Sequence, residues 1–162
     1  MKEYVEKMIR EYESMKRERQ ILLSQMNSIG FTEEDVIASM CFSHPDGERV
    51  QSSELSDKTA KVAISFRERQ RKMNEDFFSY LLKQYEHLDE EIIFLEEAIR
   101  RLPGKEGEIM QALVLEGMTW DELEVSKYLN RRTISDYRRK AIDSLVREYQ
   151  LRESQVAAYL LS

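Results

Sequence analysis

The chain has 162 residues and a formal net charge of −6, with 41% hydrophobic and 35% charged residues. Five glycines and two prolines are too few for the turns of a sheet protein, so the composition predicts an all-α fold of long helices. The single cysteine excludes an internal disulfide, and no segment approaches the roughly 20 apolar residues that span a bilayer. We therefore expect a cytoplasmic protein with no membrane partner.

Residues 2–29 form the first predicted helix, whose apolar residues recur at alternating spacings of three and four, as in a coiled-coil seam. The charged member, Arg19, can set register or partner number at some cost in stability. We expect this helix to stop at Gly30 and a short helix capped by Thr32 to follow, toward Met40. The seam consists of Val5, Met8, Tyr12, Met15, Arg19, Leu22, Met26 and Ile29.

Residues 41–56 have the composition of a loop, with histidine, proline, aspartate and glycine together at 44–47. We interpret this loop as the reversal that lets the flanking helices pack as an antiparallel hairpin. Cys41 lies near one histidine, but the other, His87, is far along the chain, and zinc sites use Cys or His pairs at short spacing. We expect no metal site and no cofactor.

The stretch from Asp57 to Leu102 contains neither glycine nor proline, so it predicts one long helix. A stutter near Phe77 and Phe78 separates two patterns. The earlier apolar face is interpreted as core, because aromatic residues at helical spacing are more often core than ligand sites: Val62, Phe66, Met73 and Phe77. The later face forms strict heptads: Phe78, Tyr85, Ile92 and Ile99 alternate with Leu81, Leu88, Leu95 and Leu102.

These later heptads extend beyond the reach of the first helix, so we expect them to pair two chains as a homo-oligomer, with a dimer favoured. Pro103 and Gly104 end the long helix, and residues 1–103 therefore form a predicted coiled-coil arm. At the other end of the chain, residues 148–162 continue as a helical tail. That tail is too apolar to stay unpacked, and we expect it on the arm or on a second copy.

Residues 104–147 predict a helix-turn-helix domain, in which short helices cross and one of them reads DNA. Its first apolar helix ends at Gly117, because glycine adopts the left-handed backbone conformation of a helix end without a steric penalty. The apolar residues of that helix are Ile109, Met110, Leu113 and Val114.

The next two helices begin at caps. Thr119 and Glu122 have the spacing of a capping box and apolar Leu123 follows, so the middle helix is expected at residues 120–129. Asn130 is a favourable cap for the last helix. Three-to-four spacing predicts one buried face on that last helix: Ile134, Tyr137, Ala141, Ile142 and Leu145.

The opposite face of the last helix is cationic. Between residues 127 and 147 seven Lys or Arg stand against two Asp, a net +5, so the rest of the chain carries −11. Charge alone fits a solvated helix face equally well, but together with the turn it predicts double-stranded DNA as the partner. Arg138 and Lys140 are expected on phosphates. The whole expected DNA-binding set is Lys127, Asn130, Arg131, Arg132, Thr133, Ser135, Asp136, Arg138, Arg139 and Lys140.

The run EGMTWDELEVSKYLNRRTISDYRRKAIDSL resembles the helix-turn-helix of sigma-70 region 4, which reads the upstream promoter element, and the match covers about residues 105–147. The order of the chain resembles small phage-encoded transcription regulators of the ArpU and RinA kind. Their helical N-terminal half carries a GxxVQSS loop followed by an Asp-Lys run. The corresponding residues here are Gly47, Val50-Gln51-Ser52-Ser53 and Asp57-Lys58-Thr59.

Three residues of the middle helix depart from the sigma-like pattern. Glu124 stands where a small residue is expected, Lys127 where an apolar one is expected, and Tyr128 where a glycine is expected. We therefore expect an unusual turn between the two helices.

The resemblance implies a sequence-specific DNA-binding transcription regulator, a phage or prophage late-gene activator in the bacterial host cytoplasm, at the nucleoid. An adaptor acting mainly on RNA polymerase and a packaging protein like a small terminase subunit are the alternatives. Small terminase subunits usually place the DNA-binding module first, and here it comes last. No phosphate-binding loop and no nucleophile with a histidine partner occur in the sequence, so we expect no enzyme.

Overall fold

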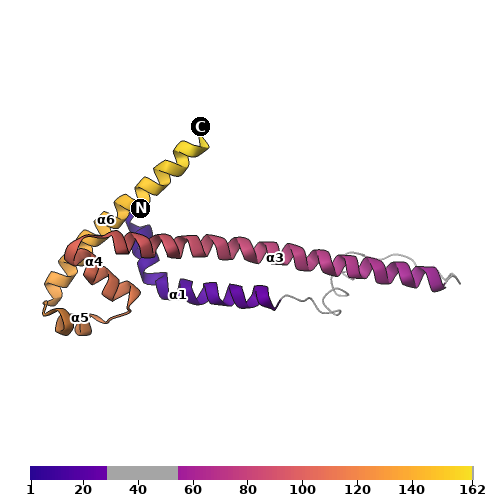
Figure 1. The fold of residues 1–162 in the computed structure, drawn as a ribbon, viewed down its shortest axis with the longest axis horizontal. Helices are drawn as coiled ribbons and strands as arrows, with labels where there is room; N and C mark the ends of the chain where they lie inside the picture. Colours follow the sequence, from indigo (N-terminus) through magenta and orange to yellow (C-terminus); the bar gives the residue numbers. More distant parts are fainter. Residues whose placement is uncertain (29–54, 162) are drawn as a thin grey trace. The chain divides into compact units, whose positions relative to one another are not determined.

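The computed structural model describes residues 1–28 and 55–161, and every regular element in these ranges is helical (Figure 1). This confirms the all-α prediction for the described part of the chain. Within it, no helix combines the length and hydrophobicity needed to cross a membrane. The elements are α1 (Lys2–Asn27), α3 (Leu55–Arg101), α4 (Gly104–Met110), the π-helical segment η1 (Gln111–Leu115), α5 (Trp120–Lys127) and α6 (Arg131–Leu160).

Two compact units divide the chain. The first unit consists of residues 1–19 and 87–162, and the second of residues 20–86. The short helix predicted after Gly30, the loop residues 41–54 and the Val50–Ser53 motif lie outside the described residues. So do Cys41 and its neighbouring histidine.

The long predicted helix is confirmed as α3, which is unbroken from Leu55 to Arg101 and starts two residues earlier than expected. In the second unit, Leu81 of this helix is buried, but Phe77 and Phe78 are 38% and 42% exposed. The interpretation of Phe77 as a core residue is therefore wrong, whereas Phe78 belongs to the heptad face that was expected to pair two chains. Apolar periodicity shows which side of a helix is hydrophobic, but it does not show whether another segment covers that side.

The first unit has one main hydrophobic core, which joins α1 to the C-terminal part of α3 and to α6. The Tyr12 hydroxyl donates to Glu96 Oε1 at 2.7 Å, and Arg19 Nη1 lies 2.6 Å from Asp89 Oδ1. The two helices run antiparallel there, and the charged seam residue has an ionic partner. The core contains Val5, Met8, Tyr12, Met15, Ile92, Leu95, Ala98, Ile99, Leu102, Met110, Val114, Ala141, Leu145 and Tyr149.

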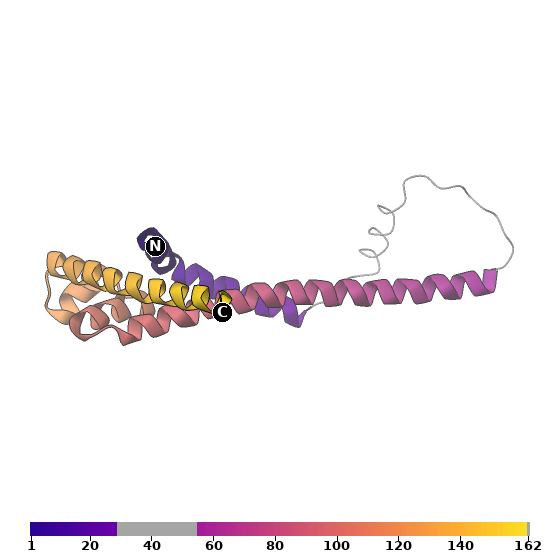
Figure 2. The same cartoon turned by 90° about the horizontal axis from the view of Figure 1, so that it is seen from above.

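This core corrects the expected dimer seam. From Ile92 to Leu102 the heptad residues of α3 are buried inside the chain, so this part of the seam is not available to pair two chains. The heptad pattern predicted only α1 as the segment that covers this seam within one chain. Figures 1 and 2 show α6 crossing the C-terminal end of α3, and the core residues of α6 complete the burial.

The connection at Pro103 and Gly104 is as predicted. α3 ends at Arg101, Pro103 caps α4 with extended backbone, and Gly104 has a φ of +54°. The compact unit that contains the predicted helix-turn-helix also contains residues 87–102 of the predicted arm.

Candidate nucleic-acid interface

A second, smaller core holds α4, η1, α5 and α6 together, the elements of the predicted helix-turn-helix. Its buried members come from α4, η1, α5 and α6, so each helix of the motif contributes at least one residue. Gly117 has a φ of +68° and ends the first of these helices, as predicted, although the last part of that helix is π-helical. The buried members are Ile109, Ala112, Leu123 and Ile134, with Leu113, Met118, Trp120, Leu129 and Tyr137 packed around them.

The capping box at the start of α5 is confirmed. The Glu122 amide donates to Thr119 Oγ1 at 3.3 Å, and the Thr119 amide donates to Glu122 Oε2 at 2.8 Å. Both hydrogen bonds that the carboxylate accepts from Thr119 stabilise its charged form, so the pKa of Glu122 lies below its usual value. α5 then ends at Lys127, two residues earlier than expected.

The turn between α5 and α6 is unusual at the predicted residue. Tyr128 has φ 53° and ψ 39°, the left-handed conformation that glycine would adopt without strain. For an L-residue this conformation costs roughly 1–2 kcal/mol. The side chain is 95% exposed, so the departure from glycine keeps a left-handed turn between α5 and α6 and places a tyrosine on the surface.

The predicted cap of α6 is also confirmed. Asn130 Oδ1 accepts hydrogen bonds from the amide and from the hydroxyl of Thr133, both at 2.8 Å. Two of the expected DNA-binding side chains therefore bind each other at the start of the helix. The predicted buried face of α6 is present: Ile134, Ala141, Ile142 and Leu145 are buried and Tyr137 is half-buried.

Three of the expected cations form ion pairs with neighbouring carboxylates. Arg131 Nη2 lies 2.5 Å from Asp121 Oδ1, and Lys127 Nζ lies 3.7 Å from an oxygen of Glu108. Arg139 pairs with Asp136 of the same helix. Exposed pairs of this kind contribute about 0–1 kcal/mol, so a phosphate group can displace the carboxylate. The acidic partners on α4 and α5 were missed in the sequence, because no short spacing links Glu108 to Lys127 or Asp121 to Arg131.

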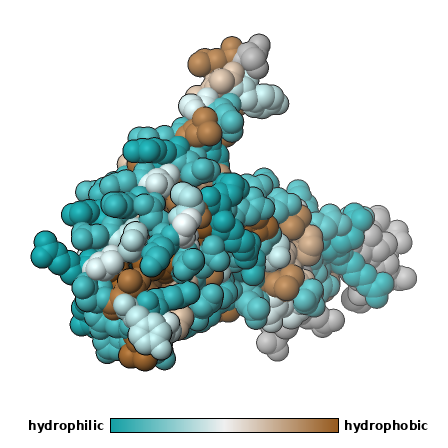
Figure 3. All heavy atoms as spheres, turned by 60° about the vertical axis from the view of Figure 1, so that its left-hand side comes forward, coloured by the Kyte–Doolittle hydropathy of each residue, from teal (hydrophilic) through white to brown (hydrophobic). Residues whose placement is uncertain are grey.

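The outward stripe of α6 carries both signs of charge. Arg132, Asp136 and Arg139 follow one another at spacings of four and three, so they share one face, opposite the buried residues. Arg139 Nη2 lies 3.0 Å from Asp136 Oδ1. Asp143 follows on the same face and lies 3.0 Å from Lys2 Nζ. The end of the molecule that comes forward in Figure 3 is mainly hydrophilic.

The remaining expected cations are Arg132, which lies on this stripe, and Arg138 and Lys140, which lie outside it. Within the described residues, Arg132 and Arg138 form no ion pair, and Lys140 is exposed with its Nζ 5.9 Å from the centre of the Tyr137 ring. Arg138 is half-buried, and Ser135 is exposed. Apart from Lys127 on α5 and the cap residue Asn130, the predicted set therefore lies on the N-terminal turns of α6. Asn130, Thr133 and Arg131 are already engaged in contacts with neighbouring residues.

A polar cluster beside the main core has a different character. Glu91 is buried, accepts a hydrogen bond from the Tyr4 hydroxyl at 2.9 Å and lies 2.5 Å from Arg152 Nη2. Arg152 also stacks over the Phe94 ring at 4.2 Å. Burial and the adjacent Glu91 carboxylate raise the pKa of Tyr4 to about 12. Arg152 balances the negative charge of Glu91, and Tyr4 donates a hydrogen bond to it. Glu91 is therefore a structural contact that joins α1, α3 and α6.

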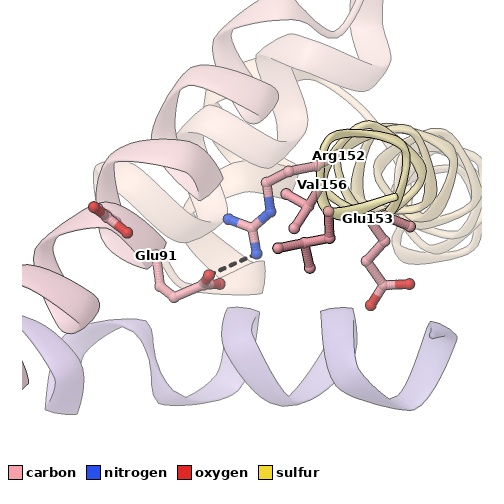
Figure 4. Close-up of a pocket in the computed structure, with 7 residues that line it drawn as sticks. Glu91, Arg152, Glu153 and Val156 are labelled. Carbon is pink, nitrogen blue, oxygen red and sulfur yellow. Dashed lines mark hydrogen bonds and ion pairs between the residues drawn. The ribbon is translucent and has the colours of Figure 1, made fainter. Parts of the chain in front are cut away.

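A groove of about 440 Å³ opens next to this cluster, between α3 and the C-terminal end of α6. Figure 4 shows Arg152 extending from α6 to Glu91, and Val156 pointing into the same groove. The lining residues are Glu90, Glu91, Arg152, Glu153, Val156, Ala157 and Leu160.

Comparison of the chain with protein-family models, with curated proteins and with solved structures gave no match.

Proposed function

We propose that the protein is a sequence-specific transcription regulator that binds double-stranded DNA with the N-terminal turns of α6. The observation that carries the proposal is the group of exposed cations, Arg131, Arg132, Arg139 and Lys140, on the N-terminal turns of a capped helix that a small core holds against α5. A helix in this arrangement fits the major groove, which is wide enough to admit it. The charge of −11 outside residues 127–147 keeps the rest of the chain away from a polyanion.

The resemblance to sigma-70 region 4 and to phage regulators supports a role at promoters, in late-gene activation of a phage or prophage. The test is to select bound fragments from bacterial and phage DNA with the purified full chain. Enrichment of fragments upstream of genes is expected. Enrichment of a single packaging start site, or of no fragment at all, would contradict a role as a transcription regulator.

Substitutions in α6 should separate base reading from phosphate contact. Arg132→Ala should lower affinity for the selected site by roughly 1–3 kcal/mol, because one good bidentate contact to a guanine has that value. Lys140→Ala should instead weaken binding to selected and random duplexes alike and reduce the salt dependence. Fluorescence anisotropy at several salt concentrations measures both effects.

The matched control is Arg10→Ala, which removes an exposed cation of α1 and should leave DNA binding unchanged. Equal losses on selected and random DNA for Arg132→Ala and Lys140→Ala would remove the division of roles between them.

We also propose that two chains act together, through the C-terminal end of α6. Val156, Tyr159 and Leu160 continue the buried side of α6 beyond Tyr149, but they are between 54% and 79% exposed. Figure 3 shows hydrophobic atoms at this projecting tip. Residues 154–161 contain no charged side chain, so two copies can meet there without like-charge repulsion. A single small DNA-binding domain, such as residues 104–147, binds DNA weakly. A pair of chains presents two such domains to neighbouring half-sites.

The expected result is sedimentation of the native protein as a dimer, and of Val156→Glu as a single chain of 19.3 kDa. Ala158→Glu is the matched control, because Ala158 is exposed on the other side of the same turn. A native protein that sediments at the mass of one chain at tens of micromolar would rule out this pairing. The same mass shift in both variants would show that the added charge acts without regard to the apolar stripe.

A further inference from the structure

The outward stripe of α6 contains a feature that phosphate binding does not explain. Asp136 lies in its centre, four residues after Arg132 and three before Arg139. A carboxylate in the middle of a surface that faces phosphates is repelled by them, so a purely electrostatic DNA-binding face would not place it there. This inference rests on the proposed function and concerns what that face selects.

The chemistry of the major groove limits what a carboxylate can contact. An ionised Asp only accepts hydrogen bonds, and the donors on base edges there are the amino groups of cytosine and adenine. Adenine presents the N7 acceptor beside its amino group, which opposes the second carboxylate oxygen. Cytosine presents its N4 amino group without a neighbouring acceptor on the same base, so a carboxylate fits cytosine better.

The basic neighbours of Asp136 have complementary roles. Arg139 lies 3.0 Å from Asp136 Oδ1 and limits the directions in which the carboxylate can point. Arg132 forms no ion pair within the described residues and lies one turn earlier on the same face, where it can donate to guanine O6 and N7. We infer that Asp136 accepts a hydrogen bond from a cytosine N4 amino group, with Arg139 as its positioning residue and Arg132 on a nearby guanine. The selected site therefore contains G·C pairs at adjacent positions.

Asp136→Asn tests this inference on the full chain. An asparagine pairs best with adenine N6 and N7, so the preferred base at one position should change from cytosine to adenine, with the other positions kept. Affinity for the original site should fall by roughly 5- to 150-fold. The measurement is selection from a randomised duplex library, followed by fluorescence anisotropy on the enriched sequences. Thermal unfolding of each variant checks that it is folded.

The matched control is Asp143→Asn, which makes the same charge change on the same stripe two turns later. Asp143 lies two turns nearer the C-terminus of α6, beside Lys2 of α1 at 3.0 Å and away from the N-terminal turns that contact bases, so this variant should keep the cytosine preference. If Asp136→Asn raises affinity for every duplex as much as Asp143→Asn does and leaves the preferred bases unchanged, the inference is overturned. If the unaltered protein binds no duplex, the proposed function fails with it. If the protein binds selectively but prefers no cytosine, only this inference fails.

Discussion

Leu95→Glu should unfold the first unit rather than separate two chains. Leu95 is 0% exposed, in the core shared by α1, α3, η1 and α6. Removal of a buried leucine side chain costs about 2–5 kcal/mol, and a buried carboxylate without a partner adds several more or takes up a proton. Because whole domains are stable by only about 5–15 kcal/mol, this sum is enough to abolish the folded unit.

The measurement is thermal unfolding followed by circular dichroism, in which the cooperative transition should be lost or shifted far down. Ile93→Glu is the matched control: it lies two residues earlier in α3, is 45% exposed, and should change the midpoint little. If Leu95→Glu keeps a normal transition and only lowers the sedimenting mass, then Leu95 lies between chains after all and the buried seam is misassigned.

Gly107→Ala should destabilise the packing of α4 and the predicted helix-turn-helix, although alanine is the better helix former. Helix propensity alone would favour alanine by about 1 kcal/mol. A Cβ atom at Gly107, however, would lie 2.3 Å from the backbone oxygen of Leu102, which belongs to the connection between α3 and α4 and cannot rotate away. The helix must shift, and forced overpacking of this kind costs typically 1–3 kcal/mol and occasionally more.

We therefore expect a net loss of stability for Gly107→Ala in chemical unfolding. If the shift of α4 also displaces α5 and α6, the proposed DNA binding should become weaker. Lys105→Ala, on the same helix but exposed, serves as the control and should be close to neutral. An increase in stability of Gly107→Ala would mean that α4 can move away from Leu102 at little cost.

Features that depend on neighbouring residues were readable from the sequence. The capping box of Thr119 and Glu122 and the Asn130 cap are satisfied within three residues, so the local sequence contains both partners. The same holds for the glycine-free run that forms α3 and for the buried face of α6, because helical spacing alone defines them. The candidate DNA-binding residues follow from that face, since they lie opposite to it.

Features that depend on distant residues were decided by the tertiary structure. Whether the apolar seam of α3 pairs with another chain or with its own depends on where α6 packs, and the periodicity of α3 holds no information about that. The pairing of Arg131 with Asp121 joins two helices across a turn, so no spacing rule predicts it. It gives Arg131, one residue of the expected DNA-binding set, a partner on α5, while Arg132 and Asp136 face outward. The sequence by itself determined which residues form helices and which of their faces are apolar or basic, because these properties are local. Only the packing of the helices decided which apolar faces are buried and which charges remain available, because those depend on contacts between segments far apart in the chain.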